Sequence, residues 1–193
     1  MNRFLSLAAA TLLAASVHAE EFRLGSKVTN FTLQNVQGGT VDFQSLKGDV
    51  TVVAFISTQC PISNDYNERM IALQKDYGQK VRFVFVNANS TEPAEVVASH
   101  AKQVNFNFPV YKDANNAVAD KFGAQVTPET FVIDKTGAIV YHGYIDDARN
   151  TARITNPGLR LALDAVLAGK PVPAAETKAF GCTIKRIKKA NSD

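Results

Sequence analysis

Runs of apolar residues along the chain predict several buried strands. The longest is Val50–Ile56, read as VTVVAFI, which is unbroken by charge and rich in β-branched residues. Such a run is typical of a central strand that is buried on both faces. Val81–Val86, which is apolar except for Arg82, and Thr130–Ile133 are shorter runs of the same kind. We therefore expect these segments to lie in one sheet.

Four other segments carry the spacing or the end signals of helices. Asn64–Lys80 has one apolar stripe at steps of three and four residues, formed by Tyr66, Met70, Leu73 and Tyr77. Thr91–Val104 begins with a proline and acidic residues, and Asn115–Phe122 is a short helix closed by a glycine. A last helix is predicted after Asn156, its expected N-cap, with Pro157 at the first helical position.

Two predicted hairpins complete the order of elements. Phe31–Val36 and Val41–Phe43 alternate apolar and polar residues around a Gly-Gly turn. Asp134–Gly137 is the turn that joins Thr130–Ile133 to a strand ending near Ile145. A hairpin, a βαβα unit, a second hairpin and a helix predict an α/β sandwich with a mixed sheet. We find no internal repeat and no second domain.

Composition and charge narrow the class of protein. The chain has 193 residues, of which 46% are hydrophobic and 20% charged, so one domain with a sizeable core is expected. The formal net charge is +3, and the basic excess is concentrated in the C-terminal tail at Lys185, Arg186, Lys188 and Lys189. There is no Trp and no nucleic-acid-binding motif, so we expect no nucleic-acid partner.

The first 19 residues predict a signal peptide. Asn2 and Arg3 precede an apolar stretch from Phe4 to Ala15, and Val17-His18-Ala19 has the small-x-small form of a cleavage site. We therefore expect cleavage after Ala19 and export to the periplasm or beyond. An uncleaved anchor is the alternative, although the apolar stretch is short for a membrane span. A disulfide can persist in an exported protein.

Cys60 is the main candidate for chemistry. It stands between the central strand and a predicted helix, and Pro61 suits the first turn of that helix. Free N–H groups and the helix dipole at such a place lower a thiol pKa and make a better nucleophile. A buried, inert cysteine is the other interpretation. Cys182 is the only other cysteine, and the sequence alone does not show whether the two meet.

Several motifs together resemble a known fold. They are CPISNDY (60–66), TPETFVIDKTG (127–137), YHGYIDD (141–147), LALDAVLAGKPVP (161–173) and ETKAFGCTIKR (176–186). In this order they resemble the thioredoxin-like fold, the redoxin (AhpC/TSA) group within it, and most of all a peroxiredoxin-like subfamily. The resemblance implies a three-layer sandwich with an N-terminal β-hairpin. The domain would span residues 20–170, followed by a tail, 171–193, that carries Cys182.

The resemblance also implies roles for individual residues. Pro128, after Thr127, would have a cis peptide bond and face Cys60. The hydroxyl of Ser57 could hydrogen-bond a peroxide held beside the thiolate. Peroxiredoxins need an arginine near the thiol, and Arg149, in the loop after the last strand, is the candidate.

Two departures from these families matter. Ser63 takes the slot of the second cysteine in the C-x-x-C motif of thioredoxins, so only Cys182 could resolve a mixed disulfide within the chain. Val53 stands where peroxiredoxins have a proline. Ser57 therefore favours a peroxide substrate, whereas Val53 and export favour thiol–disulfide exchange.

The sequence leaves two function classes open. The first is an exported thiol-dependent oxidoreductase, in which Cys60 attacks a peroxide or a protein disulfide and Cys182 resolves the product. A thioredoxin-like or membrane-bound thiol reductant would then reopen the bridge. The second is a binding module with a permanent Cys60–Cys182 staple. The cysteine and histidine spacing matches no metal pattern, so no metal or other cofactor is expected, and the oligomeric state stays open.

Overall fold

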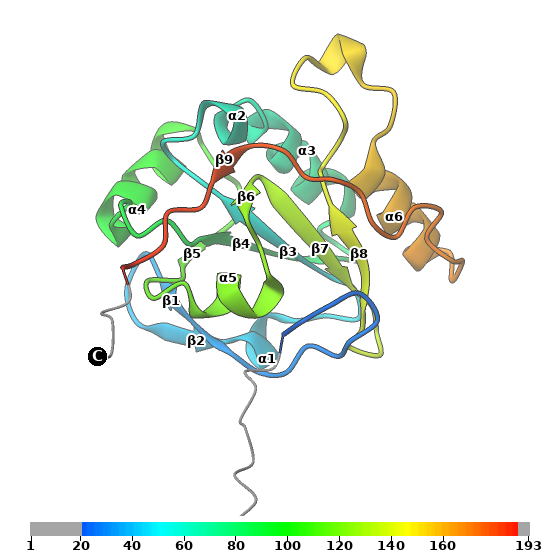
Figure 1. The fold of residues 1–193 in the computed structure, drawn as a ribbon, viewed down its shortest axis with the longest axis horizontal. Coiled ribbons are helices and arrows are strands. Elements are labelled where there is room, and N and C mark those ends of the chain that lie inside the picture. Colours follow the sequence, from blue (N-terminus) through cyan, green and yellow to red (C-terminus); the bar gives the residue numbers. More distant parts are fainter. Residues whose placement is uncertain (1–20, 189–193) are drawn as a thin grey trace, which may run out of the picture.

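A seven-stranded mixed sheet forms the centre of the protein in the computed structural model, which describes residues 21–188 (Figure 1). The predicted signal peptide, residues 1–19, lies outside the described residues. The strand order is β2-β1-β5-β4-β3-β7-β8. The strands are β1 (Thr32–Asn35), β2 (Thr40–Asp42), β3 (Thr51–Ile56), β4 (Arg82–Asn87), β5 (Val110–Lys112), β7 (Glu129–Ile133) and β8 (Ile139–Gly143).

Helices cover both faces of this sheet, which gives the expected three-layer sandwich. They are α1 (Phe43–Leu46), α2 (Pro61–Asn64), α3 (Asn67–Tyr77), α4 (Ala94–Gln103), α5 (Ala117–Phe122) and α6 (Gly158–Leu167), with a 3-10 turn, η1 (Thr151–Arg153). Leu73 of α3 and Leu163 of α6 pack in one apolar core. Phe122 of α5 packs in the other core, on the opposite face, with Phe31 and Phe55.

β3 is the central strand, as its sequence predicts. It pairs in parallel with β4 and antiparallel with β7, and all its residues are buried. Val53 faces one core and Val52 the other, because side chains alternate along a strand. The apolar run therefore predicts the strand whose C-terminal end leads to Cys60 at the edge of the sheet.

The predicted helix over residues 64–80 corresponds to α3, which begins at Asn67 and ends at Tyr77, and a separate short helix, α2, precedes it. α2 ends at Asn64 and α3 begins at Asn67, so the helix is interrupted at Asp65 and Tyr66. The Tyr66 side chain is almost fully buried, and its hydroxyl donates to Asp146 Oδ1 at 3.0 Å. Burying that ring and satisfying its hydroxyl accounts for the break, since an apolar stripe does not encode it.

Two helix starts also differ from the prediction. α4 begins at Ala94, so Glu92 lies before the helix and not in its first turn. α6 begins at Gly158 without a side-chain cap, and the Asn156 Oδ1 atom is buried without a hydrogen-bond partner. The backbone of Gly158 packs against the Tyr141 hydroxyl and the Tyr144 ring, where a Cβ would clash. Tertiary packing, and not the capping residue, sets this boundary.

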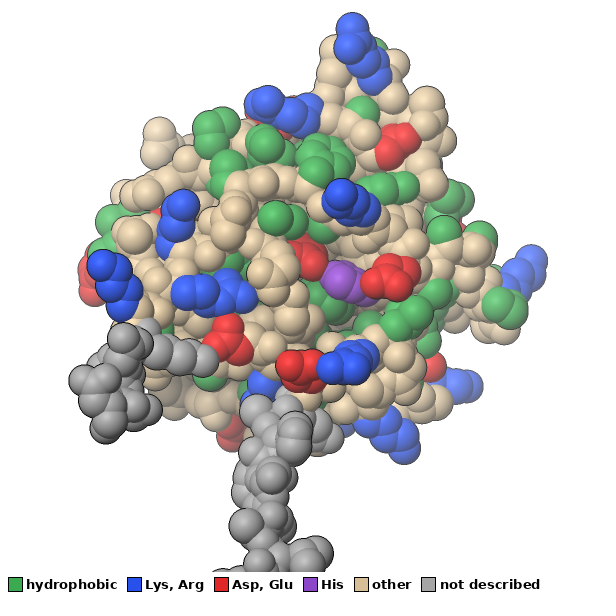
Figure 2. All heavy atoms as spheres, viewed as in Figure 1, with side chains coloured by type: hydrophobic (Ala, Val, Ile, Leu, Met, Phe, Trp, Pro, Cys, Tyr) green, Lys and Arg blue, Asp and Glu red, His purple; other side chains and the backbone are tan. Residues whose placement is uncertain are grey.

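The C-terminal segment returns across the molecule instead of leaving it (Figure 1), over a face on which apolar, basic and acidic side chains are interspersed (Figure 2). We call residues 175–187 the strap. Its strand β9 (Cys182–Thr183) pairs antiparallel with β6 (Val126–Thr127) in a separate two-stranded sheet. The strap residue Ile184 is 2% exposed, and its amide donates to the Gln125 carbonyl at 2.9 Å. No helix within residues 21–188 is long and apolar enough to cross a membrane.

Candidate active site

Cys60 is the N-cap of α2, as the sequence predicts. The chain leaves β3 at Ile56, turns through three polar residues, and places Pro61 at the start of the helix. The Cys60 Sγ atom accepts a hydrogen bond from the Ser63 amide at 3.3 Å. Ser63 occupies the slot of the missing second cysteine, and its hydroxyl accepts from the Ser57 amide at 3.0 Å.

Cys60 and Cys182 form a disulfide, which the sequence had left open. Their Cα atoms are 5.8 Å apart, within the usual range for a bridge. The β6–β9 pairing sets this distance, because it aligns Cys182 with Thr127 beside Cys60. Cys60 is 3% exposed, whereas Cys182 is partly exposed.

Thr127 and Pro128 face the bridge. The peptide bond between them is cis, as the family resemblance implies. The Thr127 carbonyl oxygen lies 3.5 Å from Cys60 Sγ. The backbone of Gly181 is pressed against the same carbonyl group, where a Cβ would clash. A glycine directly before Cys182 therefore lets the strap approach β6 closely.

Ser57 is buried beneath Cys60 and is bonded to a carboxylate. Its hydroxyl donates to Glu92 Oε1 at 2.5 Å. The same oxygen accepts hydrogen bonds from the amides of Gln59 at 3.2 Å and Cys60 at 3.1 Å. Ser57 thus connects the Cys60 backbone to Glu92, and its proton is directed away from the thiol.

Glu92 is the site residue that the sequence analysis missed. It is 2% exposed and also accepts from the Thr58 amide at 2.7 Å, the Thr58 hydroxyl at 2.8 Å and the Asn87 side-chain amide at 2.6 Å. Burial alone would raise the pKa of Glu92, but the hydrogen bonds from Ser57, Thr58 and Asn87 lower it below its ordinary value. Glu92 is therefore a buried carboxylate, which its position before a predicted helix did not indicate.

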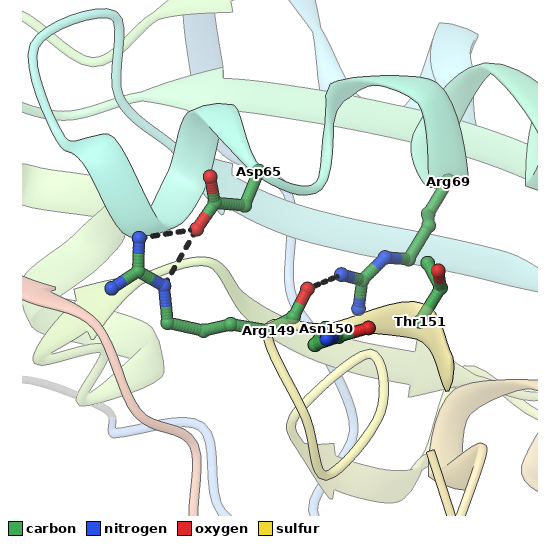
Figure 3. A pocket seen from close by; sticks show the side chains of 5 residues that line it. All are labelled: Asp65, Arg69, Arg149, Asn150 and Thr151. Carbon is green, nitrogen blue, oxygen red and sulfur yellow. Dashed lines mark hydrogen bonds and ion pairs between the residues drawn. The ribbon is translucent and has the colours of Figure 1, made fainter. Parts of the chain in front are cut away.

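Arg149 lies on the surface and pairs with Asp65 (Figure 3). Its guanidinium contacts Asp65 Oδ2 at 2.5 Å and 2.6 Å. Asp65 follows the C-terminal end of α2, whereas Cys60 caps the N-terminal end. The nearby Arg69 contacts Asp146 Oδ1 at 2.6 Å and the Ala148 carbonyl at 2.7 Å, and thereby ties α3 to the loop that carries Arg149.

Glu129 of β7, directly after the cis proline, and His142 of β8 form a second polar pair. Glu129 accepts the amides of Gln125 at 2.7 Å and Val126 at 3.0 Å, which fixes the segment that forms β6. Its other oxygen contacts His142 Nε2 at 2.6 Å. Within residues 21–188 no three His, Cys, Asp or Glu side chains are grouped so as to hold a metal ion.

The fold and the site define a class. A Cys-Pro pair at a helix start, beside a cis proline at the edge of a mixed sheet, is the arrangement of a thioredoxin-like protein. Residues 24–142 match the model of the AhpC/TSA family, which is more than half of the chain. The chain belongs to the AhpC/TSA family, and we class it with the thiol-dependent oxidoreductases.

Known proteins are similar to this chain to different degrees. The thiol-disulfide oxidoreductase ResA of Halalkalibacterium halodurans is 29% identical over 119 residues, which cover 61% of this chain and 66% of that protein. An uncharacterised conserved protein from Geobacillus kaustophilus superposes with a TM-score of 0.81 at 34% identity, covering 88% and 95% of the two chains. A secreted disulfide oxidoreductase of Mycobacterium tuberculosis shares the fold, with a TM-score of 0.51 and 21% identity over 56% of this chain and 79% of that one.

Proposed function

We propose that this protein is an exported thiol–disulfide oxidoreductase that cycles between the Cys60–Cys182 disulfide and the dithiol. The observation that carries the proposal is the bridge itself, which joins the N-cap cysteine of α2 to the strap beside the cis proline. The ResA relatives support thiol–disulfide exchange as the reaction. The predicted signal peptide supports export.

In the proposed reaction the Cys60 thiolate attacks one sulfur of a substrate disulfide. This forms a mixed disulfide and releases the other substrate sulfur as a thiolate, which takes up a proton. The Cys182 thiolate then attacks Cys60 Sγ, closes the protein bridge and releases the second substrate thiol. The substrate gains two electrons and the protein dithiol loses them. An external dithiol, carried by a thioredoxin-like or membrane-bound reductase, restores the dithiol by the same steps in reverse.

The surroundings of Cys60 suit this chemistry. The Ser63 amide points at Sγ from 3.3 Å, and α2 begins there, so negative charge on the sulfur is favoured. A thiolate stabilised in this way is also a good leaving group when the bridge is reduced. The pairing of β9 with β6 holds Cys182 beside Thr127, so Cys182 is already close to Cys60 and no large movement of the chain is needed.

A peroxide substrate is the weaker alternative. It would call on Ser57 as a donor to the peroxide and on Arg149 as the nearby cation. The bonds from Ser57 to Glu92 and from Arg149 to Asp65 support structural roles for both residues instead. We therefore place disulfide exchange ahead of peroxide reduction.

A mixed-disulfide trap tests this choice. We expect Cys182→Ser, reduced and mixed with a model peptide disulfide, to accumulate a Cys60–peptide adduct, because the resolving thiol is absent. Cys60→Ser, the matched variant, should accumulate much less adduct. Intact-mass spectrometry reports both. If one equivalent of hydrogen peroxide oxidises Cys60 faster than the peptide disulfide does, the peroxidase reading replaces this one.

A permanent staple is the second candidate function, and the near-complete burial of Cys60 favours it. The protein would then be a binding module without a redox cycle. The reduction potential separates the two, since structural disulfides lie below about −300 mV and working bridges lie higher. Equilibration with a dithiothreitol redox buffer, read as free thiols, gives that potential. A value well below −300 mV would leave only the staple.

Export has its own test. Expressed with its full N-terminus in a Gram-negative host, the protein should appear in the periplasmic fraction with a mass that begins at Glu20. A membrane-bound product of full mass would favour the uncleaved anchor. Either result leaves the redox assay unaffected.

A further inference from the structure

The loop that joins β4 to α4 lies between the two halves of the site. Its residues 88–92, with Asn87 at the end of β4, lie close to the turn before Cys60 on one side and to the strap after Cys182 on the other. We call residues 87–92 the support loop. The two cysteines are 122 positions apart in sequence, yet this one segment contacts the flank of each.

Glu92 makes the contacts to the Cys60 side. Its carboxylate receives the hydroxyl of Ser57 and both the amide and hydroxyl of Thr58, which fixes the turn that precedes Cys60. All of these partners donate, and the acceptor carries a full charge, so these bonds are among the stronger kind. The carboxylate and the Cys60 amide are separated only by the Ser57 oxygen.

Asn89 and Ser90 make the contacts to the strap side. The Lys185 amide donates to Asn89 Oδ1 at 2.8 Å, and the Lys185 carbonyl accepts from the Ser90 amide at 2.8 Å. The two bonds hold the strap backbone from both sides of one residue. Asn89 is 3% exposed, so water does not replace these bonds readily.

The support loop is ordered by groups that are independent of the bridge. The Lys112 ammonium, 5% exposed, donates to Asn87 Oδ1 at 3.0 Å and to the Asn89 carbonyl at 2.6 Å. Asn87 in turn donates to Glu92 at 2.6 Å. A buried cation and a buried carboxylate thus share one hydrogen-bonded network, in which both charges have hydrogen-bond partners, although the Asn89 Nδ2 atom is buried without one.

The strap is also anchored on the other side of Cys182. The Thr177 amide donates to the His142 carbonyl at 2.9 Å, and the Thr177 hydroxyl bonds the Tyr141 hydroxyl at 2.9 Å. Cys182 therefore lies in a short stretch with non-covalent anchors at Thr177 and at Lys185. Neither anchor involves a sulfur atom.

We propose that the support loop positions both cysteines, Cys60 through Glu92 and Cys182 through Asn89, so that the strap stays docked when the bridge is open. This rests on the proposed function only in taking the bridge to open and close. The strap then presents Cys182 to Cys60 at a high effective concentration, set by the anchors and not by a free tail. Glu92 and Asn89 are positioning residues, and neither touches substrate.

Amide exchange on an open bridge tests the docking directly. The Cys60→Ser, Cys182→Ser double variant has no bridge whatever the redox potential of the wild type. We expect the Ser90 and Lys185 amides to keep their protection in this variant, and to lose it when Asn89→Ala is added. Asn107→Ala is the control, because Asn107 is exposed and its side chain donates to the Ile71 carbonyl and not to the strap. Loss of protection in the double variant alone overturns the proposal.

The redox equilibrium supplies the second readout. With glutathione as the reference thiol, Asn89→Ala should lower the effective concentration of the dithiol at least tenfold, which is about 30 mV for a two-electron couple. A purely structural asparagine would lower the stability of both redox forms and leave this ratio unchanged. An unchanged ratio for Asn89→Ala overturns its positioning role.

The pH dependence of Cys60 alkylation tests the role of Glu92. In the Cys182→Ser background, Glu92→Gln removes a buried negative charge close to Cys60, so alkylation by iodoacetamide should shift to lower pH. Glu95→Gln, at an exposed acid on α4, should not shift it. An unshifted profile removes Glu92 from the proposal. If the strap is docked but no mixed disulfide ever forms, the positioning stands and the proposed function fails.

Discussion

The Ser57 hydroxyl donates a hydrogen bond to the Glu92 carboxylate and accepts one from the Cys60 amide. Ser57→Ala leaves Glu92 with one donor fewer and the Cys60 amide without its partner. Both groups are buried, so neither is compensated by water. We expect the free energy of unfolding to fall by about 2 kcal/mol, the usual cost of an unsatisfied buried polar group.

Urea unfolding of the oxidised protein measures this change. Ser45→Ala is the matched control, because Ser45 also donates one hydrogen bond, to the Asp42 carbonyl, but is exposed. That control should stay within about 0.5 kcal/mol of the wild type. Equal losses in the two variants would mean that the buried bond to Glu92 contributes nothing specific.

The charge on Glu92 gives the protein a dependence on pH. Its folded pKa lies below the ordinary value, because hydrogen bonds to Ser57, Thr58 and Asn87 outweigh the effect of burial. The unfolded chain therefore binds the proton first as pH falls. The stabilisation by Glu92 is complete above its unfolded pKa, near ~4.3, and is lost as the pH falls through the lower folded pKa.

Urea unfolding between pH 7 and pH 3 should therefore show a decline in stability for the wild type that is weaker in Glu92→Gln. Glu95→Gln should retain the full decline, since Glu95 is exposed. Parallel curves for the wild type and Glu92→Gln would show that another acid carries the effect.

Local patterns predicted one part of the site and could not predict the rest. The apolar run before Cys60 and the proline after it are neighbours in sequence, so the N-cap position followed from the chain itself. The cis bond before Pro128 followed only from the family resemblance. Glu92 accepts from residues more than thirty positions away, and no local pattern encodes such contacts.

At the scale of elements, long periodic segments were predicted well and two-residue strands were not. β3, β4 and β7 are mostly apolar, and the bounds of each lie within one residue of the run that predicts it. β6 and β9 are two residues each, which is too short for any periodicity to appear. Their pairing depends on the return of the strap across the molecule, which is a tertiary event.

Gly181 is the residue that makes this pairing feasible. An added Cβ would overlap the Thr127 carbonyl group, which is backbone and cannot rotate away. Gly181→Ala should therefore push β9 from β6 and cost about 1–3 kcal/mol, as other overpacked sites do. The bridge should also be reduced faster by dithiothreitol, because Cys182 is carried away with the strand.

Thiol release over time and urea unfolding together test this prediction. Gly48→Ala is the control, since a Cβ there meets the flexible side chain of Arg82 most closely. It should change neither measurement much. If Gly181→Ala matches the wild type in both measurements, the added Cβ does not separate β9 from β6, and the prediction is wrong.

At the scale of the whole molecule, one covalent link joins the centre of the sheet to the end of the described chain. Cys60 follows the central strand β3, and Cys182 lies beyond α6, so the closed loop contains most of the domain. Such a link restricts the unfolded chain far more than the folded one. Neither apolar core contains Cys60 or Cys182, and the Asn89 anchor involves no sulfur atom, so we expect the folded state to keep them when the bridge is open.

Cys182→Ser should therefore unfold at lower urea, with a loss of roughly 4–5 kcal/mol on the chain-entropy model for a loop this long. The slope of the free energy with urea should rise, because the unlinked chain exposes more surface when it unfolds. The wild type reduced with dithiothreitol should lose the same amount, which separates the cross-link from the substitution. A loss below about 1 kcal/mol would mean that the unfolded chain is already compact without the bridge, or that closing the bridge strains the folded state. If stability falls by roughly 4–5 kcal/mol and the protein still folds, the apolar cores and the strap anchors keep the fold together without the bridge.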